Sequence, residues 1–308
     1  MIRFDRFMNA ALYHPERGYY TARIKGVGSR GDFTTTPQLS DTLARAIAAA
    51  FCASDCRHLI EVGPGTGLLT KQVWLNLPFL TKRRTQQHLV EVSPPLRNLQ
   101  KENAPKATHH ETIQAALQAS GGKAFIYSNE LVDAFPARIF RKEKTGWSEL
   151  HLAGKQPQLK EHFLPVESLP DSKLFAEEHP LHQRVEIHQS YHEWLQRWLP
   201  HLTQGQILTI DYTAPSPRLL SGTLRGYFLQ DRLTGGNLYQ NAGHIDLTAD
   251  VSFDDLENWG MQLGLQTTSR QTQEQFLSPF ATKSQSDQFL TDPQGAGSAF
   301  TVLLQHLS

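Results

Sequence analysis

The chain has 308 residues, and its 30 Lys and Arg balance 30 Asp and Glu, so the formal net charge is zero. That balance argues against a general nucleic-acid binder, which carries a basic excess on one face. No apolar run approaches the length of about 18 residues that predicts a membrane span, and residues 1–20 lack the apolar core of a secretory signal. Two cysteines, Cys52 and Cys56, are too few for a disulfide framework and predict reduced thiols in a cytoplasmic protein.

Metal binding is not expected from the histidines. Fourteen of them are scattered along the chain, and His109 and His110 are the only adjacent pair. No second cluster follows at a spacing typical of zinc ligands. We therefore predict no metal site and interpret the histidines as surface residues.

Residues 1–57 show no convincing strand alternation and are expected to form an N-terminal helical extension. A helix is predicted over 40–53, with Ser40 as its N-cap and Asp41 in its first turn. The preceding Gly- and Thr-rich segment 31–37 is predicted as a loop, because Pro37 prevents a continuous helix.

From His58 onward, short apolar runs alternate with helical stretches. Strands are predicted over 58–63, 87–93 and 123–130, and helices over 66–77 and 94–103. This alternation is typical of right-handed βαβ units around a parallel sheet, so we predict an α/β, Rossmann-like fold for 58–308.

The rest of the core is expected to carry two insertions. Residues 137–180 are predicted as an inserted hairpin and loop, and Gly-, Pro- and Asn-rich residues 213–250 as an elaborated loop. Between and after them we expect helices over 184–202 and 253–265 and strands over 205–212 and 299–307.

The segment Glu61-Val62-Gly63-Pro64-Gly65-Thr66-Gly67 lies where a predicted strand passes into a helix, the usual ligand site of a doubly wound sheet. Glycines there allow close approach of a ligand to the backbone. The dinucleotide pattern GxGxxG would require glycine at Leu68, so the GxGxG spacing favours S-adenosylmethionine. A tight turn without a ligand is the alternative, but three alternating glycines exceed what a turn needs.

Glu91 ends the next predicted strand. An acidic side chain at this point can accept hydrogen bonds from both ribose hydroxyls of a nucleoside cofactor. A solvated carboxylate at a strand end is the alternative, which the upstream glycine motif makes less favoured.

The segment 128–136, SNELVDAFP, follows the strand over 123–130 and carries Glu130 and Asp133. Its position predicts carboxylates aimed at a methyl acceptor beside the cofactor. Alternatively, Asn129 caps a helical turn whose first residues are acidic. We favour the functional interpretation for Glu130 and leave both open for Asp133.

Several segments together resemble the MidA-like methyltransferases. In chain order these are ALYHPERGYY (11–20), GDFTTTPQLS (31–40), EVGPGTG (61–67), VEVSPPLRNLQ (90–100), SNELVDAFP (128–136), IDY (210–212), GTLRGY (222–227) and GHIDLTADVSF (243–253). The resemblance implies a class I Rossmann-like methyltransferase fold and S-adenosylmethionine as cofactor. It implies that one cleft is lined by cofactor-binding residues, namely Thr34, Glu61, Gly63, Gly65, Gly67, Glu91 and Asn129.

The family includes a mitochondrial arginine methyltransferase of complex I assembly, so the resemblance implies a protein arginine as acceptor, such as one on a subunit of a respiratory complex. The chain departs from the family's usual residues at Gln38, Thr213 and Gln230, all in the acceptor half.

An arginine acceptor would require carboxylates that grip its guanidinium. We predict Glu130, Asp133 and Asp211 as catalytic residues, with Asp246 an alternative second carboxylate. Two other functions stay open. A small-molecule O- or N-methyltransferase would use a deep apolar pocket, with Tyr212 or a histidine accepting a proton. A non-catalytic assembly protein would keep the cofactor pocket as a structural element.

Overall fold

The computed structural model describes residues 1–24, 36–215, 217–228 and 231–307 and contains a seven-stranded central sheet. Its strand order is β14-β15-β10-β5-β2-β3-β4, in which β15 runs antiparallel to β10 and β14 and the others are parallel. The strands are β2 (His58–Val62), β3 (Gln86–Val90), β4 (Thr108–His110), β5 (Lys123–Asn129), β10 (Gln204–Tyr212), β14 (Gln266–Thr272) and β15 (Phe300–Leu307). The predicted Rossmann-like α/β class is confirmed.

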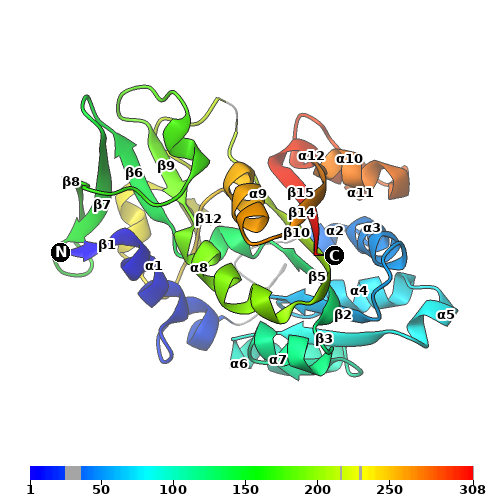
Figure 1. Cartoon of the computed structure of the whole chain (residues 1–308). Coiled ribbons are helices and arrows are strands. Elements are labelled where there is room, and N and C mark those ends of the chain that lie inside the picture. Colours follow the sequence, from blue (N-terminus) through cyan, green and yellow to red (C-terminus); the bar gives the residue numbers. More distant parts are fainter. Residues whose placement is uncertain (25–35, 216, 229–230, 308) are drawn as a thin grey trace.

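Helices cover both faces of this sheet (Figure 1). The helices around the sheet are α3 (Thr42–Cys52), α4 (Leu68–Asn76), α6 (Pro94–Asn103), α7 (Ile113–Ala119), α8 (Gln189–Trp198), α9 (Phe253–Gln262), α10 (Gln273–Leu277), α11 (Gln285–Leu290) and α12 (Ala296–Ala299), while α5 (Phe79–Lys82) buries no residue. The helix predicted over 40–53 begins only at Thr42, and the Ser40 hydroxyl accepts a hydrogen bond from the Thr42 amide at 3.1 Å. No helix of the described residues is long and apolar enough to cross a membrane.

The strand order places a topological switch point at the centre of the sheet. From β2 the chain moves outward through β3 and β4, then returns to place β5 and β10 on the other side. The connections after β2 and β5 therefore diverge at the carboxyl ends of adjacent strands. This arrangement opens a crevice where α/β sheets bind their ligands.

A second, antiparallel sheet lies beside the central one (Figure 1). Strands β1 (Ile2–Arg3), β7 (Trp147–Ala153), β6 (Arg138–Lys142) and β9 (Arg184–Ile187) form it in that order, and β8 (Lys160–Pro165) also pairs with β7. The hairpin predicted within 137–180 is thus present. The helix predicted over 184–202 was wrong at its start, because Val185 and Ile187 are buried in β9 and α8 begins at Gln189.

The segment 213–250, predicted as a loop, contains a small third sheet. It has the order β12-β11-β13, formed by β11 (Arg225–Phe228), β12 (Asp231–Leu233) and β13 (Asp246–Thr248). The prediction missed these strands because each has only three or four residues.

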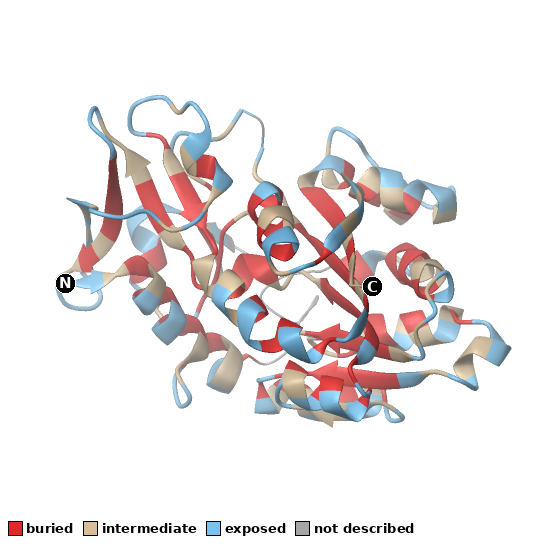
Figure 2. Ribbon diagram, viewed as in Figure 1, coloured by how far each residue is buried: buried red, intermediate tan, exposed pale blue. Residues whose placement is uncertain are grey.

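The N-terminal segment packs into the same body. It contains β1, α1 (Phe4–Tyr13), the π-helical turn η1 (Tyr19–Arg23) and α2 (Thr36–Leu39), so it is not purely helical. Its apolar residues share one core with the second and third sheets, including Phe4, Ile139 and Leu247. Two further apolar clusters fill the two faces of the central sheet, whose strands are mostly buried (Figure 2).

Candidate functional site

A cavity of about 680 Å³ lies at the switch point, over the carboxyl ends of β2, β3 and β5. The glycine loop after β2 forms one wall, and the loop after β5 forms another. The N-terminal segment adds Tyr13 and Tyr20, and α8 adds Trp194 and Arg197. The structure therefore brings together segments that are more than 100 residues apart in the sequence.

The glycine loop has the backbone conformation that only glycine adopts without strain. Gly63, Gly65 and Gly67 have φ angles of 67°, 53° and 80°. A Cβ atom on Gly63 would lie 2.7 Å from Cδ1 of Leu131, so the loop after β5 packs directly against it. Gly67 is the N-cap of α4, and Gly63, Gly65 and Thr66 line the cavity. These positions fit a cradle for a ligand at the start of a helix.

Helix α6 holds this loop in place through two side-chain amides that the sequence analysis did not single out. The Gln100 amide donates to the Gly65 carbonyl at 2.7 Å, and the Asn103 amide donates to the Thr66 carbonyl at 3.0 Å. Gln100 ends the segment 90–100 that carries the family resemblance, but no role was predicted for it or for Asn103. Only the packing of α6 beside the loop reveals their role.

Glu91 lies on the cavity wall just past β3 and is 6% exposed. One carboxylate oxygen accepts from the Ser93 amide at 2.8 Å, and the other accepts from Gln100 at 3.3 Å. Burial raises the pKa of Glu91 to about 7, although these hydrogen bonds oppose the shift. Glu91 lines the cavity, so its carboxylate is placed for the predicted contact to two ribose hydroxyls.

Glu61 also lies at the cavity, but its carboxylate points to the protein. One of its oxygens accepts hydrogen bonds from the Thr70 hydroxyl and, at 2.8 Å, from the Tyr127 hydroxyl. Burial raises the pKa of Glu61 to about 7. We therefore interpret Glu61 as a residue that ties β2 to α4 and β5 below the cofactor loop.

Glu130 has a strained backbone on the opposite wall. Its φ angle is 53°, which is rare for a residue other than glycine and is typical of functional loops. Its carboxylate accepts from the Asn129 amide at 3.0 Å, and burial raises the pKa of Glu130 to about 7. Within the described part of the chain, Asn129 Oδ1 is buried without a hydrogen-bond partner. Both residues line the cavity, so Asn129 offers an open acceptor to an ammonium group of the cofactor.

The other predicted catalytic acids lie behind this wall. The Asp211 carboxylate, fully buried, accepts from the amides of Val132 at 2.7 Å and Leu131 at 3.1 Å. Asp133 is 4% exposed, and burial together with the nearby charge of Asp211 holds its pKa well above the usual range. Neither residue is part of the cavity wall. Asp211 thus positions the loop through its amides, and the acceptor contact predicted for Asp211 and Asp133 stays a prediction.

Tyr20 connects the cavity to Asp246, the alternative second carboxylate. Its hydroxyl donates to Asp246 at 2.6 Å, and its ring stacks on Tyr13 with centroids 5.6 Å apart. Tyr13 in turn donates to the Ala134 carbonyl at 3.0 Å. The sequence analysis assigned no role to either tyrosine, although both belong to the segment ALYHPERGYY. Tyr212 is not part of the cavity wall and packs on Phe300.

Two of the residues discussed above lie outside the described part of the chain. These are Thr34, predicted to bind the cofactor, and Gln230, one of the three departures. Gln38 lines the cavity, whereas Thr213 forms a β-bridge with Val251.

Metal ligation finds no support among the described residues, in which no group of three His, Cys, Asp or Glu could hold an ion. The prediction that the histidines lie on the surface was wrong for His88 and His188, each of which is 2% exposed. His88 hydrogen bonds His58 and His110 across three adjacent strands, at 3.0 Å each.

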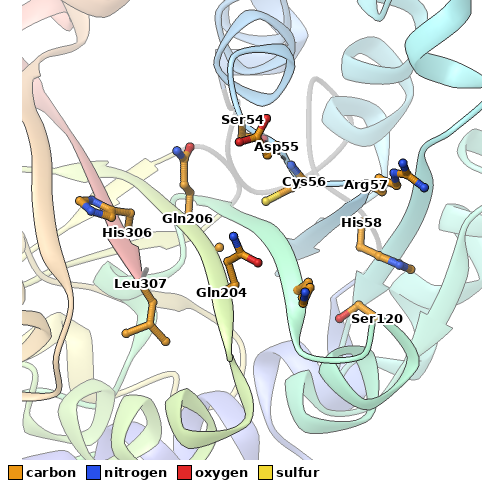
Figure 3. A pocket seen from close by; sticks show the side chains of 12 residues that line it. Ser54, Asp55, Cys56, Arg57, His58, Ser120, Gln204, Gln206, His306 and Leu307 are labelled. Atoms are coloured by element: carbon orange, nitrogen blue, oxygen red, sulfur yellow. Dashed lines mark hydrogen bonds between the residues drawn. The ribbon is translucent and has the colours of Figure 1, made fainter.

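A second pocket, of about 460 Å³, lies at the opposite edge of the sheet (Figure 3). It surrounds the amino ends of β2, β5 and β10, where His58, Lys123 and Gln204 begin these strands. Parallel sheets bind ligands at their carboxyl ends, so this pocket is not the cofactor site.

Comparison with known proteins agrees with this geometry. A family model described as "Putative S-adenosyl-L-methionine-dependent methyltransferase" matches residues 42–271, most of the chain. The chain belongs to this family. It is 27% identical to the mitochondrial protein arginine methyltransferase NDUFAF7 of Rattus norvegicus over 290 residues, which cover 82% of this chain and 64% of that protein. The Xenopus tropicalis protein of the same name is 28% identical, with 82% of this chain and 66% of that protein covered.

A solved structure supports the fold. It is the crystal structure of a protein from Burkholderia thailandensis bound to S-adenosyl-homocysteine. Its TM-score is 0.84 and its identity 24%, and the match covers 99% of this chain and 87% of that one. A native crystal structure from the same organism has a TM-score of 0.82, with the same identity and coverage. The family and the fold class predicted from the sequence are therefore confirmed. The alignment covers about two thirds of the length of these arginine methyltransferases. It therefore shows the family but not the methyl acceptor.

Proposed function

We propose that the chain transfers a methyl group from S-adenosylmethionine to an arginine side chain of a protein. The observation that carries this proposal is the Glu130 carboxylate, which lines the cavity just past the end of β5. Other acids of the lining have partners within the protein, since Glu61 accepts from Thr70 and Tyr127 and Glu111 pairs with Arg97. A carboxylate at this place can bind a cationic guanidinium, which a small-molecule hydroxyl acceptor would not require.

The residues present fit the cofactor. The glycine loop allows close backbone approach, the Glu91 carboxylate lines the cavity, and Asn129 Oδ1 has no hydrogen-bond partner among the described residues. S-Adenosylmethionine, when bound, supplies an electrophilic methyl group on a sulfonium. The arginine methyltransferases that match this chain support the choice of acceptor.

Glu130 has two tasks in this proposal. Its carboxylate accepts hydrogen bonds from the guanidinium, which orients one nitrogen toward the cofactor. As that nitrogen gains a methyl group it must release a proton, and a carboxylate with a pKa of about 7 can accept it. Asp211 assists indirectly, because its bonds to the loop amides hold Glu130 in place.

A lysate experiment tests the proposal. Wild-type protein is incubated with cofactor labelled on its methyl group and with lysate lacking this protein, and label is measured in protein and in small molecules. Methylarginine in hydrolysed protein is expected, and the Glu130→Gln protein should yield about 10²-fold less. Label confined to small molecules would support a small-molecule methyltransferase instead. No transfer and no cofactor binding in calorimetry would leave a non-catalytic assembly protein.

Two narrower features belong to the same proposal. The protein that carries the arginine would be a subunit of a respiratory complex, as the family resemblance implies. The location would be the cytoplasm, as the reduced Cys52 and Cys56 suggest. Mass spectrometry of the labelled protein and fractionation of cells test these features separately.

A further inference from the structure

An apolar tip projects from the molecule between α4 and β3. Helix α5 follows Pro78 and lies at the periphery, beyond α3 and α4 (Figure 1). Phe79 is 71% exposed, Leu80 is 70% exposed, and Leu75 at the end of α4 is 63% exposed. The Lys82 ammonium donates to the Leu75 carbonyl at 2.9 Å, which joins both ends of the tip. We call residues 75–84 the tip.

The tip is also basic, in a chain that has no net charge. Residues 62–90 contain Lys71, Lys82, Arg83 and Arg84 but no Asp or Glu. Arg83 and Arg84 are exposed, and the Arg83 guanidinium lies 5.9 Å from the centre of the Phe79 ring. Within the described residues, none of these four cations forms a salt bridge.

Exposed apolar residues are common when they occur singly, as Met261 does at 51% exposure. The tip differs because large apolar and basic side chains share one protrusion. A symmetric contact between two copies would place the same cations against each other, which disfavours a second copy as the occupant. An anionic bilayer offers negative headgroups to the cations and an apolar interior to Phe79 and Leu80.

We propose that the tip docks the protein on the surface of an anionic lipid bilayer. Helix α4 starts at the glycine loop and ends at the tip, so the tip lies one helix length from the cavity. Docking through the tip therefore leaves the cavity open to an acceptor protein. This surface is independent of the methyl-transfer chemistry proposed above.

Co-sedimentation of the full chain with vesicles tests the proposal. Binding is expected to vesicles of phosphatidylglycerol and phosphatidylcholine, but not to phosphatidylcholine alone, and should weaken as salt is added. The double variant Phe79→Ser/Leu80→Ser should lose at least about tenfold in affinity. Arg83→Glu/Arg84→Glu should lose at least about tenfold in vesicle affinity, because it reverses the charge that faces the anionic headgroups. The control Met261→Ser removes an isolated exposed apolar residue and should bind as the wild type does.

Three outcomes would overturn the proposal: no binding to anionic vesicles, equal binding to neutral vesicles, or full binding by both double variants. Sedimentation velocity adds a further discrimination. A dimer that the Phe79→Ser/Leu80→Ser change abolishes, without vesicle binding by the wild type, would assign the tip to self-association. Thermal melting and methyl transfer in vesicle-free solution should match wild type in both double variants, which separates this test from that of the proposed function.

Discussion

The left-handed backbone of Glu130 makes a prediction that links stability to activity. A residue other than glycine at a φ of 53° costs about 1–2 kcal/mol, and glycine avoids this cost. Glu130→Gly and Glu130→Gln both remove the charge, but only the glycine variant relieves the backbone. At about 2 °C per kcal/mol for a chain of this size, the glycine variant should melt about 2–4 °C above the glutamine variant.

Differential scanning calorimetry at pH 8 measures this difference. Single-turnover methyl transfer should fall by about 10²-fold or more in both variants, because each loses a preorganised electrostatic contact. Cofactor affinity in titration calorimetry should change by less than about threefold, because Glu130 is proposed to contact the acceptor and not the cofactor. Equal melting temperatures would refute the strain argument. Turnover near the wild-type value would refute the assignment of Glu130, and a collapse of cofactor affinity would move it into the cofactor site.

Three further predictions concern the cofactor wall. Glu91→Ala should weaken cofactor binding by at most about 1.5–3 kcal/mol for each of two lost hydrogen bonds. In calorimetry, removing the ribose hydroxyls from the cofactor should reduce its affinity for this variant less than its affinity for the wild type. Because the Glu91 pKa is raised to about 7 and only the carboxylate accepts both hydroxyls, wild-type affinity should rise between pH 6 and 8, and this rise should shrink in Glu91→Ala. Gly63→Ala should lower both stability and cofactor affinity, because its Cβ would clash with Leu131. The control Gly121→Ala, at a φ of 62° with open space around it, should lower stability alone. Equal losses of cofactor affinity in the two alanine variants would contradict this prediction.

The central sheet could be predicted because its strands carry a strong local signal. Runs such as 58–62 and 123–129 are apolar and are bounded by turn residues, so the sequence alone predicts strands that are buried on both faces. Strand β9 lacks that boundary, since its buried residues continue directly into the amphipathic helix α8. The strands of 213–250 are too short for a periodic pattern, and their pairing depends on partners far along the chain.

The candidate site was predictable to the extent that strand ends determine it. Glu91 and Glu130 follow β3 and β5, so topology alone brings them to one cavity. The strand ends do not determine the direction in which a side chain points. Asp211 is the penultimate residue of β10, but it turns toward the loop amides because they would otherwise be buried without partners. Gln100 and Tyr20 were missed since their roles arise from packing between distant elements.

The loop after β5 is held by parts of the chain that lie outside the βαβ core. The Tyr13 hydroxyl from α1 binds the Ala134 carbonyl, and the Ala249 amide, which follows β13, donates to the Asp133 carbonyl at 3.1 Å. Together with Asp211, these contacts fix the loop from three sides, so Glu130 can stay in a conformation that an isolated loop would leave. The N-terminal segment and the third sheet thus have a common task. They maintain the strain that directs the Glu130 carboxylate into the cavity.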